Sequence, residues 1–441
     1  MTYKYFPHTD KELKEMLEVC GKRTLDELFD EIPESIQFKR DYDLPSEMSE
    51  VEQRRFYTEL GAKNKSLTCF AGAGCYDHYS PAVISHIISR SEFLTSYTPY
   101  QAEISQGTLQ YIFEFQSMMT ELTGMEVGNA SMYDGATATA EAMMMAVSAA
   151  KKKNKVLVAS TLNPNVKAVL ETYAKYQGII LEYIAECDGV CDKVDFEEKL
   201  AAGDVAGVIV ATPNYYGILE NYEGWADACH AQKALLIMNC QASTLGAIKS
   251  PGEWGADIAA GDGQSLGIPM NFGGPYVGFL CTKKALIRKM PGRVVGATKD
   301  LKGKRSFVLT LQAREQHIRR EKATSNICSN QSLMALYVTI YLALMGTKGL
   351  KEVNELSYSG AHYLAEQLCK TGKFEMAYPQ KPYLNEFTLK TSLDINKLQN
   401  VCAENGILAG VEIASDKLLL CVTELRSKAE INNLVDIVKS F

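Results

Sequence analysis

The stretch Ala234-Leu-Leu-Ile-Met-Asn239 decides the fold: it is a short apolar run that ends in a polar residue. Similar runs, separated by segments with helical periodicity, occur at Lys155–Ser160, Gly178–Tyr183, Val205–Thr212, Ala256–Ala260 and Tyr276–Thr282. Apolar runs that alternate with helices are typical of a mainly parallel sheet covered by helices on both faces. We therefore expect a large α/β domain.

Polar residues follow several of these runs. They are Asn163-Pro-Asn165, Thr212-Pro-Asn-Tyr-Tyr-Gly217, Asn239-Cys-Gln241 and Gln264. In open parallel sheets, ligands bind at the carboxyl ends of the strands. We expect these residues to meet in one crevice.

The chain has 441 residues, 46% hydrophobic and 22% charged, with a formal net charge of -7. This length exceeds one compact core, so we expect an N-terminal helical arm (1–65), a large α/β domain (66–330), and a linking helix with a small C-terminal α+β domain (331–441). The acidic balance argues against a nucleic-acid partner.

Helix signals mark the predicted arm. Thr9-Asp-Lys-Glu12 and Thr24-Leu-Asp-Glu27 each have the spacing of a capping box, and a further helix is expected from Ser49 to Leu60. The apolar run Ala335–Met345 is too short to cross a bilayer and predicts a buried helix, with a hinge marked by Gly346 and Gly349. No membrane association is expected.

The N-terminal residues 1–8 lack an apolar signal core, so we expect a cytoplasmic protein. The twelve cysteines are scattered, and none of the close pairs has the spacing of a zinc or redox motif. We expect reduced structural thiols and no metal site.

Several ordered segments resemble the glycine dehydrogenase (decarboxylating) of the glycine cleavage system, the P-protein family, along nearly the whole chain. They are Phe70-Ala-Gly-Ala-Gly-Cys-Tyr-Asp-His-Tyr-Ser-Pro81, Thr98-Pro-Tyr-Gln-Ala-Glu-Ile-Ser-Gln-Gly107, Tyr133-Asp-Gly-Ala-Thr137, Pro269-Met-Asn-Phe-Gly-Gly-Pro275, Met290-Pro-Gly-Arg-Val-Val-Gly296 and Gln312–Ile327. The resemblance implies a fold type I domain, like that of aspartate aminotransferase, which binds pyridoxal phosphate (PLP).

Such domains carry an Asp that pairs with the pyridinium nitrogen and a Lys that forms the Schiff base. Here Asn239 stands at the expected Asp position and Gln264 at the expected Lys position, and neither can supply that chemistry. The chain thus resembles subunit 1, the N-terminal subunit of the two-chain form. The resemblance implies that PLP is bound to the lysine of subunit 2, with none held covalently on this chain.

The resemblance also implies the reaction and the partners. Together with subunit 2, the chain would act on glycine, release its carboxyl group as carbon dioxide, and pass the aminomethyl group to the lipoyl arm of the H-protein. Two other functions stay open: a PLP-free scaffold or regulatory binding protein of the same fold, and a stand-alone PLP enzyme that uses an unusual lysine such as Lys283.

Active sites of this fold type lie at subunit interfaces, so this chain is expected to contribute residues to its partner's site. The candidates are Tyr97, Thr98, Tyr100, Gln101, Glu103 and Arg314. From sequence alone, the tyrosine segment also fits a surface turn. Arg314 lies in a charged helical stretch that fits an ion-paired helix, with His317 a packed histidine. Tyr133–Thr137 is expected to be a vestigial phosphate site at a helix N-terminus, and Gly72-Ala-Gly74 a tight turn.

Overall fold

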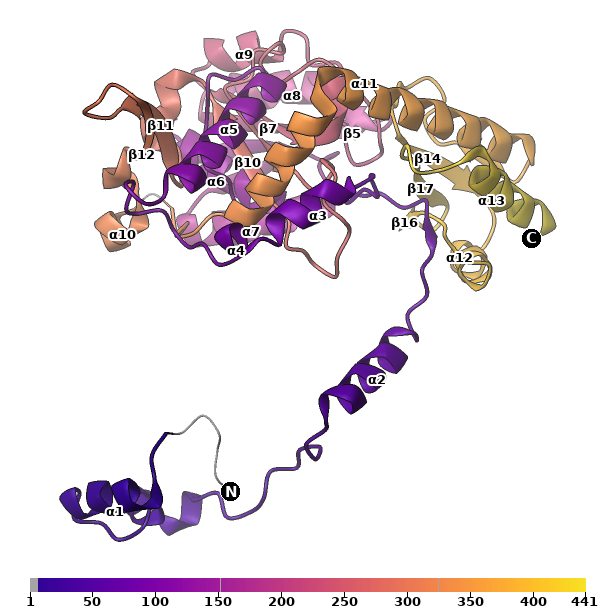
Figure 1. Ribbon diagram of the computed structural model, residues 1–441. Helices are drawn as coiled ribbons and strands as arrows, with labels where there is room; N and C mark the ends of the chain where they lie inside the picture. The colour runs from indigo at the N-terminus through magenta and orange to yellow at the C-terminus, as the bar shows by residue number, and fades with distance from the viewer. Residues whose placement is uncertain (1–6, 151, 324) are drawn as a thin grey trace. The chain divides into compact units, whose positions relative to one another are not determined.

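The computed structural model describes residues 7–150, 152–323 and 325–441. The chain divides into two units, Met1–Lys65 and Ser66–Phe441. Figure 1 follows the chain from the N-terminal helices to the C-terminal helix α13. The two units are described separately.

The described part of the N-terminal unit, residues 7–65, contains two helices and two short 3-10 turns. The helices are α1 (Asp10–Val19) and α2 (Glu50–Gly61), and the turns are Asp26–Phe29 and Glu34–Ile36. Capping boxes at Thr9 and Ser49 begin the two helices, as the sequence predicted for Thr9. The predicted box at Thr24 is wrong as a helix start: the Glu27 carboxylate accepts the backbone N–H of Arg23 at 2.7 Å, and only a 3-10 turn follows.

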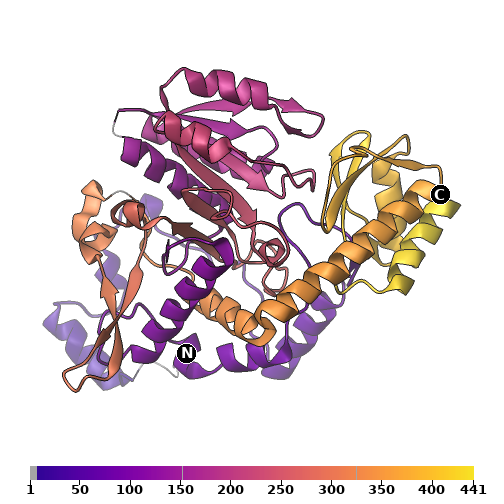
Figure 2. The same cartoon turned by 90° about the horizontal axis from the view of Figure 1, so that it is seen from above.

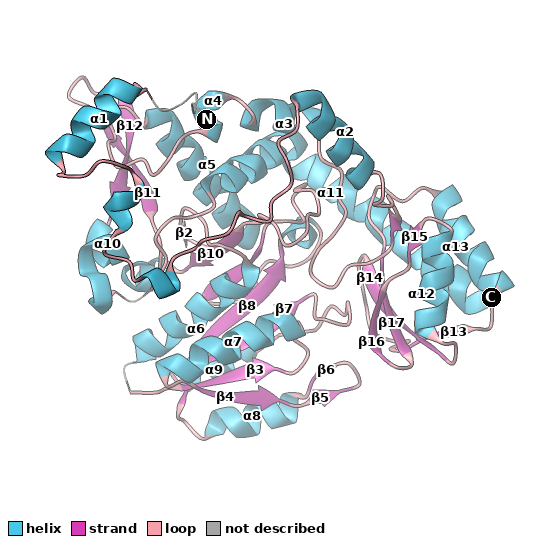
Figure 3. Cartoon of the chain, turned by 90° about the horizontal axis from the view of Figure 1, so that it is seen from below, coloured by secondary structure: helices cyan, strands magenta, loops and turns pink. Residues whose placement is uncertain are grey.

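The second unit is built on a seven-stranded sheet with the order β2-β10-β9-β8-β7-β3-β4 (Figure 3). The strands are β2 (Val127–Gly128), β3 (Lys155–Ala159), β4 (Ile180–Ile184), β7 (Val205–Thr212), β8 (Leu235–Gln241), β9 (Ile258–Asp262) and β10 (Gly278–Thr282). Strand β10 runs antiparallel to both of its neighbours, β2 and β9, and the other described pairs of this sheet are parallel. The predicted mainly parallel sheet is confirmed.

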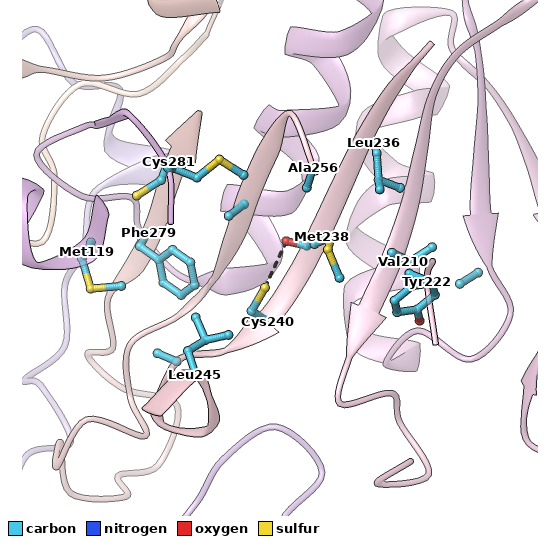
Figure 4. Close-up of a cluster of buried hydrophobic side chains, with 14 of the residues drawn as sticks. Met119, Val210, Tyr222, Leu236, Met238, Cys240, Leu245, Ala256, Phe279 and Cys281 are labelled. Atoms are coloured by element: carbon cyan, nitrogen blue, oxygen red, sulfur yellow. Dashed lines mark hydrogen bonds between the residues drawn. The ribbon is translucent and has the colours of Figure 1, made fainter. Parts of the chain in front are cut away.

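The strands alternate their side chains between two cores, one on each face of the sheet. In β8, Leu236, Met238 and Cys240 lie in the first core, and Ile237 lies in the second. Figure 4 shows part of the first core, where the Cys240 thiol donates to the Met238 carbonyl at 3.4 Å. Because β7 and β8 are buried on both faces, their sequences read as continuous apolar runs.

Different helices cover the two faces. The first core contains side chains of α5 (Gln106–Thr123), α8 (Lys193–Ala201) and α9 (Trp225–Ala231), and of the start of α11. The second core is closed by α6 (Gly135–Ala150) and α7 (Pro164–Gln177). The second unit also contains separate two-stranded sheets. Two of them are β5 (Glu186–Cys187) with β6 (Val190–Cys191), and β11 (Val294–Lys299) with β12 (Arg305–Thr310).

Helix α11 (Ser332–Lys370) joins the large layer to a C-terminal α+β layer, and Figure 2 shows it running toward the yellow C-terminal elements. It bends at Gly346, whose φ of 58° and ψ of -173° are not helical, so the predicted hinge is present there. Gly349, the second predicted hinge residue, lies in regular helix. The C-terminal sheet has the order β13-β14-β17-β16, built from β13 (Phe374–Met376), β14 (Glu386–Thr391), β16 (Val411–Ala414) and β17 (Lys417–Cys421).

Helices α12 (Ile395–Glu404) and α13 (Lys428–Ser440) pack on this sheet around a core of their own. The short strand β1 (Thr68–Cys69) pairs with β15 (Ile407–Leu408), so the start of the second unit is tied to its end. The helices α3 (Ala82–Ile88) and α4 (Ser91–Leu94) follow β1.

By length and composition alone, one helix among the described residues, α11, is apolar enough to cross a bilayer. However, 44% of its most apolar window is buried inside the protein, and Ala335, Val338 and Tyr341 belong to the first core. Core helices meet the same criterion, and these buried positions assign α11 to the protein interior.

Candidate functional site

A cavity of about 330 Å³ lies where the parallel strands end. Its lining includes Asn163, Asn165, Pro213, Asn214, Tyr215, Asn239, Cys240 and Gln241. The predicted meeting of polar strand ends in one crevice is therefore confirmed for these residues. Its volume lies in the range of small-molecule pockets.

Asn239 faces this cavity from β8. Its amide nitrogen donates to the hydroxyl of Thr139 on α6 at 2.8 Å. The Asn239 side chain is neutral, so it offers no carboxylate to hold a proton on a pyridine ring.

Gln264 does not line the cavity, although the sequence placed it in the crevice. Its side chain is 1% exposed and bonds to the backbone of Tyr76, accepting from N–H and donating to C=O, each at 2.8 Å. A third bond, to the Ile268 carbonyl, also measures 2.8 Å. The neighbouring Ser265 lines the cavity instead.

Two carboxylates lie at the N-terminus of α6, where the sequence predicted a vestigial phosphate site. Asp262 accepts the N–H of Gly135 at 2.9 Å and that of Gln264 at 2.8 Å. Asp134 accepts the N–H of Thr137 at 2.7 Å. Burial raises the pKa of Asp262 to about 6, which still leaves it mostly ionised in neutral solution.

Glu386 reaches the cavity from the C-terminal sheet, at the start of β14. Its carboxylate accepts the backbone N–H of Ala73 at 2.5 Å and the hydroxyl of Tyr76 at 3.0 Å. Burial raises its pKa to about 7. A Cβ at Gly72 would collide with this carboxylate, which explains the glycine in the segment Gly72-Ala-Gly74.

The cavity does not fit PLP. The described residues that line it include no Lys, Arg or His. Where an Asp would pair with the pyridine ring of PLP, the chain has the neutral Asn239. Carboxylates occupy the helix N-terminus that would hold the phosphate. Lys283, the alternative Schiff-base lysine, bonds to Asp257 at 2.7 Å and is not in the lining.

The residues predicted to serve a partner lie outside the cavity lining. Tyr97 and Tyr100 are 79% and 50% exposed, Gln101 and Glu103 are exposed, and Thr98 is half-buried. The side chains of Tyr97, Tyr100, Gln101 and Glu103 therefore lie on the surface of the second unit.

Tyr100 rests on a buried ion pair. The guanidinium of Arg293 lies 5.5 Å from its ring centroid and donates to its hydroxyl at 3.3 Å. Arg293 and Glu315 approach to 3.6 Å, with side chains 3% and 4% exposed, and His317 lies 3.4 Å from the same carboxylate. Sequence reasoning missed this pair, because residues 22 positions apart on separate elements give no periodic signal.

Arg314 is engaged within the chain. Its guanidinium donates to the carbonyls of Met290, Gly292 and Leu311, the last two at 3.0 and 3.2 Å. The helical reading of this stretch holds only for the four residues of α10 (Gln316–Arg319). His317 packs near Tyr100, with ring centroids 5.5 Å apart. Arg314 therefore holds the loop before β11.

Sequence reasoning also did not weigh Asp262 and Glu386. The bond of Asp262 to Gly135 joins residues 127 apart, and Glu386 contacts Ala73 across 313 residues. The cysteines described are all free. Within the described part of the chain, no group of three His, Cys, Asp or Glu side chains is arranged to hold a metal ion.

Comparison with known proteins places these observations in a family. The family model described as glycine cleavage system P-protein matches residues 3–438. The chain is 49% identical over 437 residues to a probable glycine dehydrogenase (decarboxylating) subunit 1 from Moorella thermoacetica, covering 98% of each chain. A protein of the same description from Carboxydothermus hydrogenoformans is 49% identical over 444 residues, covering 99% of each.

Solved structures also resemble this chain. A crystal structure of glycine decarboxylase (P-protein) of the glycine cleavage system, in inhibitor-bound form, superposes with a TM-score of 0.91 at 40% identity, covering 99% of this chain and 100% of that one. A sphingosine-1-phosphate lyase from Burkholderia pseudomallei has a TM-score of 0.67 at 13% identity, covering 93% of this chain and 94% of the lyase. The second likeness shows the fold alone.

Proposed function

The chain belongs to the glycine cleavage system P-protein family, and from that premise we propose that it is the subunit of glycine dehydrogenase (decarboxylating) that lacks the Schiff-base lysine. It works only together with a second subunit that carries this lysine and binds PLP. The observation that carries the proposal is the cavity at the strand ends, where Asn239 stands on the wall and no lysine is among the described lining residues.

In this proposal PLP supplies the electron sink that accepts the charge left when glycine loses its carboxyl group. The cofactor is held by subunit 2. The aminomethyl group then passes to the lipoyl arm of the H-protein. This chain contributes one half of the core, and a wall of the partner's pocket that positions the substrate and excludes water.

The loop from Tyr97 to Glu103 is the part of that wall we assign to this chain. The loop combines aromatic side chains with hydroxyl, amide and carboxylate groups, from Tyr97, Thr98, Tyr100, Gln101 and Glu103. Tyr97 is 79% exposed and Tyr100 is 50% exposed. An exposed aromatic that rests on a buried Arg is preorganised to contact another surface. Arg314 takes part indirectly, because it holds the loop before Arg293.

The N-terminal unit supports a heteromer through its own surface. On α2, Phe56, Tyr57 and Leu60 are 48%, 65% and 45% exposed, and no described side chain of this helix is buried. Apolar side chains clustered on one short helix indicate a surface that is covered in an assembly. We propose that subunit 2 covers it, in a complex that works in the cytoplasm.

Reconstitution tests the proposal. The full-length chain, subunit 2, lipoylated H-protein, PLP and glycine are combined, and exchange of labelled bicarbonate with the glycine carboxyl group is measured. We expect exchange with both subunits together and none with either alone. Full exchange by subunit 2 alone would instead favour a scaffold role, and exchange by this chain alone would favour a stand-alone enzyme.

A further inference from the structure

The N-terminus of α6 is a wall of the cavity at the strand ends. Gly135 and Ala136 from its first turn, and Asp134 just before it, belong to the lining together with Asp262. The first N–H groups of a helix have no partner within the helix, and they carry the positive end of its dipole. Such a helix end binds phosphate readily when it is open.

Here the chain's own carboxylates take up two of these donors, the N–H groups of Gly135 and Thr137. Asp262 accepts from Gly135, the first residue of α6, at 2.9 Å, and Asp134 accepts from Thr137, the third, at 2.7 Å. The fit at Gly135 is so close that a Cβ there would lie 2.6 Å from the backbone nitrogen of Asp262. A phosphate at this helix end would meet an occupied donor and two negative charges.

Nothing else in the cavity compensates for that charge. Glu386 adds a third carboxyl group, and the described lining residues include no cationic side chain. Asp262 itself is held in place from two sides, since Gln264 N–H also donates to it at 2.8 Å. Cavity volume is not the barrier, because about 330 Å³ lies in the range of small-molecule pockets.

We infer that Asp262 is the specificity residue that excludes phosphate-bearing ligands from this chain's own cavity, by occupying the N-terminus of α6. The exclusion is built into the anion site itself. It therefore acts in addition to the missing lysine and does not depend on the partner or on the proposed reaction. Restoring a lysine without removing Asp262 leaves the phosphate site closed.

The test is an anion titration of the full-length chain by calorimetry at neutral pH. Asp262→Ala removes both the charge and the contact with Gly135, whereas Asp262→Asn removes the charge alone. The probes are inorganic phosphate, PLP, and pyridoxal, which lacks the phosphate. Removing a like charge within hydrogen-bonding distance of the ligand position is expected to strengthen phosphate binding at least about ten-fold. PLP should gain affinity and pyridoxal should not.

Glu386→Gln is the matched control, because it removes a carboxyl group from the same cavity but leaves Asp262 on Gly135. Thermal unfolding checks that each variant is folded. If Asp262→Ala does not fold, Asp262→Asn decides the test. Gained phosphate affinity in a folded Asp262 variant, without a gain in the control, supports the inference. Saturable phosphate binding by the wild-type chain, an equal gain in Glu386→Gln, or no gain in a folded Asp262 variant overturns it.

Discussion

The side chain of Gln264 pairs with the backbone of Tyr76 through two hydrogen bonds of 2.8 Å, one to the N–H and one to the C=O. This pairing ties the loop after β9 to the segment that precedes α3, across 188 positions of sequence. Gln264, at the position expected for a catalytic lysine, thus has a structural role here, and it is not among the residues that line the cavity.

The first prediction concerns this pairing. Gln264→Lys should form no borohydride-reducible PLP adduct at position 264, because the new amine replaces a buried amide outside the cavity lining. The change should also destabilise the chain, by about 1 to 3 kcal/mol for each Tyr76 group left unpaired. Peptide mapping after reduction and chemical unfolding measure the two effects. Gln264→Leu, which loses the bonds without adding an amine, is the stability control; a pyridoxyl group on residue 264 would contradict the prediction.

The strands were predictable because burial on both faces leaves a direct mark on the sequence. The pattern placed one strand at Val205–Thr212, the bounds that β7 has, and another at Ala234–Asn239, where β8 spans Leu235–Gln241. At Thr24 only half of the box forms: the Thr24 hydroxyl accepts the N–H of Glu27 at 3.3 Å, but the Glu27 carboxylate accepts from Arg23 and not from Thr24. The spacing of the residues could not show which N–H the carboxylate would take.

The chemistry of the cavity was only half predictable. Asn239 could be placed because a residue at the end of a parallel strand has a known position. The direction of Gln264 and the contact of Asp262 with α6 depend on loop geometry, and Glu386 enters from a different sheet. No local periodicity reports contacts of that kind.

The second prediction concerns pH. Burial raises the pKa of Glu386 from its ordinary 4.5 to about 7. The folded state therefore holds a proton that the unfolded chain releases between those values. This contribution to stability is fully present below about pH 4.5 and is lost as pH rises through 7. For a pKa shift of this size, the free energy of unfolding falls by about 3 kcal/mol over that range.

Glu386→Gln should remove that part of the pH dependence. The free energy of unfolding, measured from pH 5 to 8, should fall more steeply for the wild type than for the variant. Other titrating groups, including Asp262, are present in both and largely cancel in the difference. Glu404→Gln, at an exposed position of α12, is the control and should leave the slope unchanged. A wild-type slope equal to that of Glu386→Gln would refute the prediction.

The third prediction concerns the buried pair beneath Tyr100. The Nε of Arg293 and the Oε1 of Glu315 are both buried without a hydrogen-bond partner. Removing one member leaves an uncompensated charge, so Glu315→Leu alone and Arg293→Met alone should each cost about 3 to 5 kcal/mol of unfolding free energy. The double variant that combines these two substitutions should cost less than either single variant. A double-mutant cycle in urea measures this coupling, and additive effects would argue against it.

The final prediction concerns the exposed tyrosines, and it rests on the proposed role of their loop in the partner's active site. Tyr97→Ala and Tyr100→Ala should each lower turnover of the reconstituted complex about ten-fold or more, because misplaced pocket walls reduce catalysis strongly. Assembly, followed by size-exclusion chromatography, should not change. Tyr100→Phe keeps the ring on Arg293 and loses only the 3.3 Å bond, so it should retain more activity than Tyr100→Ala. Tyr176→Ala, an exposed residue of α7, is the surface control. Unchanged turnover in both loop variants would show that the loop serves only as a surface turn.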